Sequence, residues 1–389
     1  MSEQNPFTAP PPPNLGADMS SLFQSTARHE QLWNLLFAPE IADIRINRHD
    51  RVFYFDGFST KQLQNVFSSA QDYKDFITSL LPLTDVGFVS YEDVDIPLLE
   101  GSFTDATTQG KLKGSLIVAT DILTRAEPSL VIRKQPIDII TLDTMVEQQM
   151  LNPAMRNLLV AAVQGRQNIL ISGGSGAGKT TLARALAQFI DPAQRVLTVE
   201  EIDELHLDDR LPNVVALTTH TKRDVNGRVV EEQSLEDLVR HALRMRPDRI
   251  VVGEVRGPEA TALIKSCLSG HDGSLTTIHA NNATQAAKQL ITYATESPGI
   301  TESIAREYVA QAFSLAVQIS RVALGRRVVT EIVELDPVRE GTEQRTSPLW
   351  LYDHQRQGWQ QAGSPSGRLI ESMQRHNTNI DVQTLFPAR

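Results

Sequence analysis

The chain has 389 residues, enough for two or three domains at about 150 residues each. Lys and Arg number 37 against 47 Asp and Glu, and this net charge of −10 argues against sequence-nonspecific DNA binding, which needs many phosphate contacts. The single cysteine, Cys267, excludes a disulfide within the chain, and no run of about 18 apolar residues predicts a transmembrane helix. The first residues also lack the basic and apolar regions of a signal peptide, so we expect a cytoplasmic protein.

The N-terminal part of the chain contains two different patterns. Residues 1–26 are rich in Pro, Ser, Asn and Gln, and the run Pro10–Pro13 favours polyproline II, so we predict a disordered arm that is a plain tail or a docking peptide. Residues 27–141 are predicted to form a mixed α/β domain. A helix is expected at 29–39 and one or two helices at 60–81, with strands at 41–47, 51–57, 113–123 and 129–135, and a loop or hairpin tip at 100–114.

Beyond a connector expected at 142–152, strands and helices alternate. This order predicts a largely parallel sheet covered on both faces, in a domain that spans 153–336. Two closing strands are expected at 316–322 and 327–336, and residues 337–389 are predicted to form a small C-terminal appendage. The other strands are expected at 166–172, 195–200, 214–218, 248–254 and 274–280, and the helices at 152–165, 179–190, 234–246 and 258–268.

The strongest motif is Gly173–Thr180, which satisfies G-x-x-x-x-G-K-[ST] and lies between an expected strand and an expected helix. Its glycines allow the backbone to curl so that N–H groups point at phosphate oxygens, and the helix N-terminus adds partial positive charge. Lys179 is then expected to reach the β- and γ-phosphates and the Thr180 hydroxyl to bind Mg²⁺. The motif predicts an ATP and Mg²⁺ site, but kinases, GTPases, helicases and motors all share it.

Carboxylates end two of the expected strands. Glu254 follows an apolar strand that is expected to run beside the strand before Gly173, where a carboxylate can polarise the attacking water or accept its proton. The alternative is a surface glutamate that ends a strand. The second group of carboxylates consists of Glu200, Glu201, Asp203 and Glu204. One or two of them could hold Mg²⁺ through water or orient the nucleophile, since strand ends in such sheets open onto the ligand crevice. The alternative is a solvated acidic turn.

Five arginines lie within 17 residues of one another, namely Arg240, Arg244, Arg246, Arg249 and Arg256. Arginine near a phosphate site can neutralise charge that develops on the γ-phosphoryl group, and Arg256 is the best placed of the five. The alternative is ordinary surface pairing of Arg240 with Glu236 and Asp237 on one helix.

Two histidines, His271 and His279, flank residues 274–278 of an expected strand. Their spacing matches no compact set of metal ligands. His279 is either an ordinary turn histidine or a contact for the γ-phosphate, and spacing leaves both interpretations open.

Four segments, taken in order, closely resemble the secretion-ATPase superfamily, which powers type II and type IV secretion, pilus assembly and conjugation. The resemblance is greatest to the CpaF-like branch that serves Tad-type pili, conjugation and type IV secretion. The C-x-x-C pairs of the zinc module in type II secretion motors are absent from the sequence. The four segments are 173–186, 198–207, 242–260 and 270–282.

The resemblance implies a RecA-like domain preceded by a smaller α/β domain that lies over the nucleotide and supplies arginine. It makes Gly173–Thr180 the Walker A loop, Glu254 the Walker B catalytic glutamate and His279 part of the family's histidine box. Arg133 matches the family's I-R-K pattern, whereas Leu116 stands where a second N-terminal arginine is common. Ser175 is a milder departure from a frequent Thr. The acidic box would be Glu200, Glu201 and Glu204.

The resemblance further implies an ATP-hydrolysing hexameric ring, peripheral to the cytoplasmic face of a bacterial inner membrane, with secretion or pilus platform proteins as partners. Nucleic acid is not expected as a direct ligand. Two other hypotheses stay open, a RecA-like nucleic-acid translocase and a nucleotide-binding regulatory scaffold with little turnover. The predicted catalytic residues are Glu254, Lys179, Glu201, Arg256 and His279; the nucleotide-binding ones Gly174, Ser175, Gly176, Ala177, Gly178, Lys179, Thr180, Thr181, Arg133 and Arg240; the metal ligands Thr180, Glu200 and Glu254.

Overall fold

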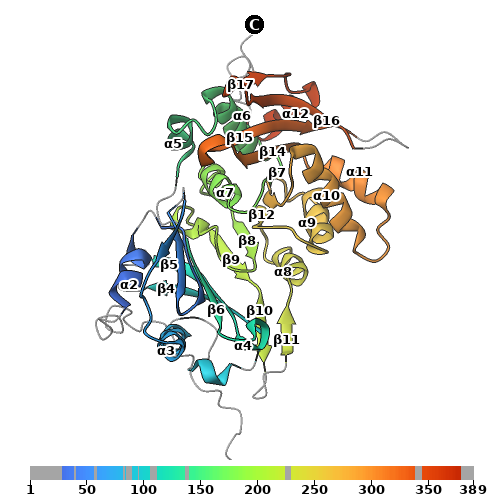
Figure 1. Cartoon of the computed structure of the whole chain (residues 1–389). Helices are drawn as coiled ribbons and strands as arrows, with labels where there is room; N and C mark the ends of the chain where they lie inside the picture. The colour runs from blue at the N-terminus through green and yellow to red at the C-terminus, as the bar shows by residue number, and fades with distance from the viewer. Residues whose placement is uncertain are drawn as a thin grey trace, which may run out of the picture. The chain divides into compact units, whose positions relative to one another are not determined.

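The computed structural model divides the chain into two compact units, one up to Gln135 and the other from Ile140 onward (Figure 1). Both units combine helices and strands, which confirms the predicted α/β class. The predicted arm of residues 1–26 lies outside the described part of the chain. The described residues are 29–38, 41–56, 59–81, 84, 90–94, 96–105, 112–135, 140–223, 229–337 and 344–377.

The first unit is built on an antiparallel sheet with the strand order β3-β2-β1-β6-β5-β4. Its helices pack against the sheet through buried side chains such as Leu32 and Ile77, which join Ile44 and Leu130 in one core. The strands are β1 (Asp43–Arg48), β2 (Arg51–Phe55), β3 (Thr60–Leu63), β4 (Leu98–Asp105), β5 (Leu112–Ala119) and β6 (Ser129–Gln135), and the helices α2 (Glu30–Phe37), α3 (Ala70–Leu80) and α4 (Asp121–Thr124).

Two expectations for this unit need correction. The stretch 60–81 was expected to form one or two helices, but Thr60–Leu63 is a strand that pairs with β2, and the α-helix is Ala70–Leu80. Ser69 accepts a hydrogen bond from the backbone N–H of Asp72 and so defines where the helix begins. The second expectation was a loop or hairpin tip at 100–114. Much of this stretch is instead strand, because β4 and β5 form an antiparallel hairpin that pairs from Leu98↔Ala119 to Asp105↔Leu112.

The second unit contains two hydrogen-bonded groups of strands, β12-β8-β9 and β13-β7-β14-β15-β16-β17. A parallel bridge between Val255 and Ile278 joins them, so the strands follow the order β9-β8-β12-β13-β7-β14-β15-β16-β17. Pairing is parallel as far as β14 and antiparallel beyond it. The strands are β7 (Ile169–Ser172), β8 (Val196–Glu200), β9 (Val214–Thr218), β12 (Arg249–Val252), β13 (Leu275–Ile278), β14 (Leu315–Arg321), β15 (Arg327–Leu335), β16 (Thr346–Asp353) and β17 (Gly358–Gln361), beside a separate hairpin of β10 (His220–Arg223) and β11 (Val229–Gln233).

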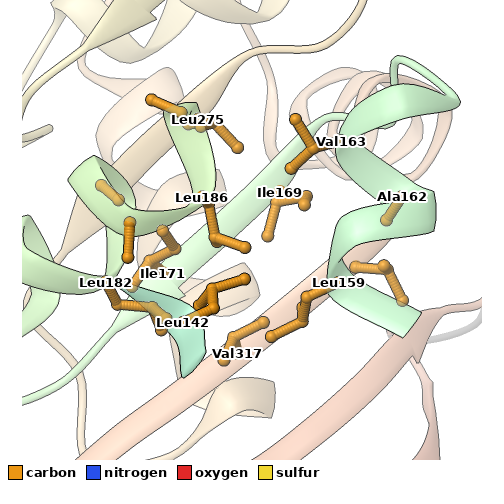
Figure 2. Close-up of a cluster of buried hydrophobic side chains, with 14 of the residues drawn as sticks. Leu142, Leu159, Ala162, Val163, Ile169, Ile171, Leu182, Leu186, Leu275 and Val317 are labelled. Atoms are coloured by element: carbon orange, nitrogen blue, oxygen red, sulfur yellow. The ribbon is translucent and has the colours of Figure 1, made fainter. Parts of the chain in front are cut away.

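Helices cover both faces of this sheet, as the alternation of elements predicts. Ile169 and Ile171 of β7 lie in one core and the intervening Leu170 in the other, because successive strand residues point to opposite faces. Figure 2 shows the first core, with Leu159 and Leu186 among its members. Helices α5 (Leu142–Glu147), α6 (Pro153–Gln164), α7 (Lys179–Ala187) and α12 (Gly367–His376) line the first core, and α8 (Leu235–Ala242), α9 (Glu259–Leu268), α10 (Ala283–Thr295) and α11 (Glu302–Ala312) line the second.

The segments that bracket the predicted motor domain are integral to this unit. The connector expected at 142–152 contains α5, whose Leu142 (Figure 2) is fully buried in the first core, as is its Met145. The appendage expected after residue 337 extends the sheet through β16 and β17, and its Leu349 and Met373 are fully buried as well. Among the described residues, none of the helices has the length and apolar character that crossing a bilayer requires.

Candidate nucleotide site

The glycine-rich loop connects the buried strand β7 to α7, which is the context that the motif predicts. Gly176 and Gly178 have φ values of +65° and +107°, a left-handed conformation that favours glycine. A Cβ on Gly173 would lie 2.4 Å from the carbonyl oxygen of Ile319 on β14, so this loop position needs glycine for a close backbone approach. The sequence therefore allows a tight loop whose backbone N–H groups are available at the start of α7.

Lys179 brings the loop and two other strand ends together. Its side chain is 8% exposed, and Nζ lies 3.3 Å from the carbonyl oxygen of Gly173. Nζ is also 3.5 Å from Oε1 of Glu254 and 3.3 Å from each ring nitrogen of His279. Three residues predicted from separate motifs thus converge on one point beside the loop.

Glu254 reaches this point from a different position than expected. Its strand, β12, is not the neighbour of β7, because β13 pairs with β7 and lies between them. The carboxylate nevertheless accepts hydrogen bonds from Arg256 at 2.5 and 2.9 Å, and its Oε1 is 2.8 Å from Nε2 of His279. Burial raises the pKa of Glu254, but the charges of Lys179, Arg256 and His279 outweigh it, so the pKa is lowered and the carboxylate is ionised.

Arg256 bridges the two acidic strand ends. Besides Glu254, its guanidinium donates to Oε2 of Glu201 at 2.7 Å. The buried Glu259 accepts from the backbone N–H groups of Arg256 and Gly257 and so fixes the turn that carries the guanidinium. The structure therefore joins Glu254, Arg256 and Glu201, three of the predicted catalytic residues, in one network.

In the described part of the chain, the predicted metal ligands Thr180, Glu200 and Glu254 each have different partners, and their role as a set stays a prediction. Oγ1 of Thr180 contacts Oε2 of Glu204 at 3.4 Å, and oxygen atoms of this kind fit Mg²⁺. Glu200 instead packs against Gly253, where a Cβ would lie 2.6 Å from its Cγ, and accepts from the backbone N–H groups of Glu204 and Leu205. Burial, followed by the nearby Asp203, raises the pKa of Glu200 to about 9, so its carboxyl is neutral at pH 7.

Several predicted residues lie elsewhere in the fold. Arg240 is exposed on α8 and pairs with Glu236 at 2.5 Å, as the surface interpretation expects. Arg133 is exposed on β6 of the first unit, and its role at the nucleotide stays a prediction. Leu116, on β5 of the same unit, is 1% exposed and belongs to the core, so an arginine there would be buried. His271 lies in the turn after α9, beside Ser269.

Arg249 has a structural position that its motif did not reveal. It is 1% exposed at the start of β12, and its guanidinium donates to Oε1 of Gln194 and to the carbonyl oxygens of Gly273 and Val163. Glu254 lies after the other end of the same strand. Arg249 is therefore separated from the candidate site, and from Arg256, by the length of β12.

Sequence reasoning missed two arginines that contact the glycine-rich loop. Arg321 and Arg327 both donate hydrogen bonds to the carbonyl oxygen of Gly176. A third residue, Gln318, accepts from the Ser172 hydroxyl at 2.5 Å and donates to the carbonyl oxygen of Ala280, next to His279. All three residues belong to β14 and β15, which were expected only to close the sheet. The sequence feature that could have indicated their role is the pair of arginines on either side of the turn between these two strands.

An open pocket of about 340 Å³ lies beside the same loop. It is lined by Gly174, by His279 and by the polar face of α10, which contributes Gln285, Lys288 and Gln289. The pocket gives solvent access to the side of the loop on which His279 lies.

The fold and the loop are those of an α/β protein of the P-loop class. The model of a family described as "Type II/IV secretion system protein" matches residues 116–318, more than half of the chain, and the chain belongs to this family. The resemblance stated from the four sequence segments is confirmed.

Individual relatives come from conjugation and type IV secretion. The conjugal transfer protein TrbB of Rhizobium radiobacter is 34% identical over 215 residues, 54% of this chain and 62% of that protein. The type IV secretion system protein PtlH of Bordetella pertussis is 37% identical over 182 residues, 45% of this chain and 52% of that protein. The alignments thus span about half to three fifths of these relatives. The solved structure of the Yersinia pseudotuberculosis ATPase DotB has a TM-score of 0.58 at 17% identity, covers 82% of this chain and 80% of that one, and supports the fold.

Replacing Arg256 by Gln is expected to move the acid limb of the pH profile of ATP hydrolysis to higher pH. Arg256 lowers the pKa of Glu254, so its removal raises that pKa, and the ionised carboxylate is lost sooner as the pH falls. The measurement is kcat/KM against pH. Arg306→Gln, which breaks a surface pair with Glu302 on α11, is the matched control. Superimposable acid limbs for Arg256→Gln and the wild-type chain would contradict the assignment.

Proposed function

We propose that the chain is an Mg²⁺-dependent ATPase that drives a type IV secretion, conjugation or Tad-like pilus machine. The observation that carries this proposal is the convergence of Lys179, Glu254 and His279 beside a glycine-rich loop, in a chain of the type II/IV secretion family. A regulatory scaffold has no need for an ionised carboxylate held next to the lysine of a phosphate-binding loop.

The residues of the chain divide the chemistry among them. Lys179 and the N-terminus of α7 bind the β- and γ-phosphates, and the loop N–H groups orient them. Glu254 accepts the proton of the attacking water, so that ATP and water give ADP and phosphate. Arg256 orients Glu254, and His279 contacts the carboxylate from the other side. A bound Mg²⁺ would neutralise phosphate charge, and Thr180 and Glu204 offer the oxygen ligands to hold it.

The proposed working form is a hexameric ring on the cytoplasmic face of a bacterial inner membrane, in contact with platform proteins of the machine. In this form residues 153–336 act as a RecA-like motor domain, and the α/β domain at 27–141 supplies Arg133 to the nucleotide. Family membership and the names of the relatives, which refer to conjugal transfer and type IV secretion, support this proposal.

The test is phosphate release from ATP per chain, measured over a range of protein concentrations without DNA. A specific activity that rises and then saturates is expected, because assembly completes the sites of a ring. Lys179→Ala should abolish it, since the ammonium group that binds the phosphates is lost. Absence of both nucleotide binding and phosphate release at every concentration would overturn the proposal, and turnover that appears only with DNA would favour the translocase.

A further inference from the structure

Arg321 and Arg327 meet at a single backbone oxygen of the glycine-rich loop. Nη2 and Nε of Arg321 lie 3.0 and 3.3 Å from the carbonyl oxygen of Gly176, and Nε of Arg327 lies 3.2 Å from it. Arg321 ends β14 and Arg327 begins β15, so the loop is held by the turn between two strands that lie about 150 residues further along the chain.

A β-bulge creates this arrangement. Gln318 pairs with Glu331, but the next residue of β14, Ile319, pairs with Val329, so Thr330 is an extra residue in β15. The shift places Arg321 directly opposite Arg327. Without it, Arg321 would face Val328, whose side chain is fully buried. Bulges of this kind often re-aim a side chain next to a functional site.

The arginine pair is unfavourable for the sheet by itself. Like charges directly opposite each other on neighbouring strands destabilise the pairing. Burial, followed by the charge of Arg321, lowers the pKa of Arg327, and no ion pair of Arg327 with a carboxylate occurs among the residues that the structure describes. The like-charge pairing is therefore a cost to the two strands, and a neighbouring site for an anion offers a reason for it.

The geometry points to a positioning role for this pair at the nucleotide, and we propose that Arg321 and Arg327 clamp the phosphate-binding loop through Gly176. The carbonyl and the N–H of one trans peptide group point in opposite directions, so holding the Gly176 oxygen outward directs the N–H of Ala177 to the inside of the loop. There it donates to the carbonyl oxygen of Gly174 at 3.2 Å. The two positive charges on the outside also favour a polyanion inside. This inference rests on the proposed function.

The experiment compares Arg321→Met and Arg327→Met with Arg326→Met. Arg326 lies in the same turn but donates to Gln149 instead of the loop, which makes it a matched control. A fluorescent ATP analogue is titrated into each full-length protein. The two clamp variants are expected to raise its Kd about tenfold or more, since charge-assisted hydrogen bonds are the strong ones, while Arg326→Met leaves the Kd unchanged. In hydrolysis, KM is expected to rise more than kcat falls, because the clamp acts on binding.

Unfolding of the nucleotide-free proteins separates this role from a structural one. Each Met variant removes the repulsion between Arg321 and Arg327, which stabilises the fold, and also removes a hydrogen bond to Gly176, which destabilises it. Because the two changes oppose each other, the clamp variants should unfold at nearly the wild-type urea concentration. Arg321→Lys retains the charge on an exposed side chain and should recover part of the affinity. Wild-type Kd values in both Met variants, or a loss of affinity matched by a loss of stability, would overturn the clamp. A wild-type chain that binds no nucleotide would overturn the proposed function instead.

Discussion

Replacing Glu254 by Gln is expected to slow ATP hydrolysis by about 10²- to 10⁴-fold, the usual contribution of a positioned general base. Glutamine retains the size of the side chain and an oxygen that can accept from Arg256, so the network around it persists. It cannot accept a proton, and it no longer balances the charge of Lys179. Nucleotide should therefore bind the variant at least as tightly as the wild-type chain.

The measurement combines steady-state phosphate release with titration of a fluorescent ATP analogue. Glu302→Gln on α11 is the control, because it removes a carboxylate that pairs with Arg306 on the surface. Retention of normal turnover in Glu254→Gln would exclude Glu254 as the base. Loss of binding together with turnover would instead assign it a part in holding the loop.

Replacing Arg249 by Met is expected to lower the free energy of unfolding by about 2–4 kcal/mol, because buried acceptors lose their donor. The guanidinium donates to Oε1 of Gln194 and to the carbonyl oxygens of Gly273 and Val163, and Arg249 is only 1% exposed. Burial, and then Arg166, lowers the pKa of Arg249 to about 10, so the group is still charged at pH 7. Gly273 has a φ of +95°, and a Cβ there would lie 2.4 Å from the guanidinium of Arg249. The turn therefore needs glycine at this position to accommodate the arginine side chain.

Urea unfolding followed by circular dichroism gives the free-energy difference by linear extrapolation. Arg306→Met, which removes a partly exposed arginine that pairs with the exposed Glu302, should change stability by less than about 1 kcal/mol. Equal losses in the two variants would show that the buried hydrogen bonds of Arg249 do not stabilise the unit.

The parts of the site that could be predicted are local in sequence. Gly173–Thr180 carries its own context, because an apolar strand precedes it and a helix with regular spacing follows. Glu254 and His279 were found in the same way, since each follows an apolar strand, and the ends of parallel strands open onto the same edge of a sheet.

The parts that could not be predicted depend on which strands become neighbours. Local patterns specify that β12 and β13 are strands, but the position of β13 between β7 and β12 depends on pairing between segments that are far apart in the sequence. For the same reason, closeness in sequence placed Arg249 with Arg256, although β12 separates them. The contacts of Arg321 and Arg327 with Gly176 needed both the strand order and a bulge at Thr330, and neither has a signature in the sequence.

Lys179 of the glycine-rich loop already forms an ion pair with Glu254. Its ammonium group lies 3.5 Å from the Glu254 carboxylate. Under the proposed function, an arriving phosphate would therefore replace Glu254 as the partner of Lys179 instead of neutralising an unpaired charge. This exchange would make the gain in binding free energy smaller than an unpaired lysine provides, and release of ADP correspondingly easier. It would also leave the carboxylate with Arg256 and His279 as its partners at the moment when the γ-phosphate is in place, so that nucleotide binding itself would release the proposed base from Lys179.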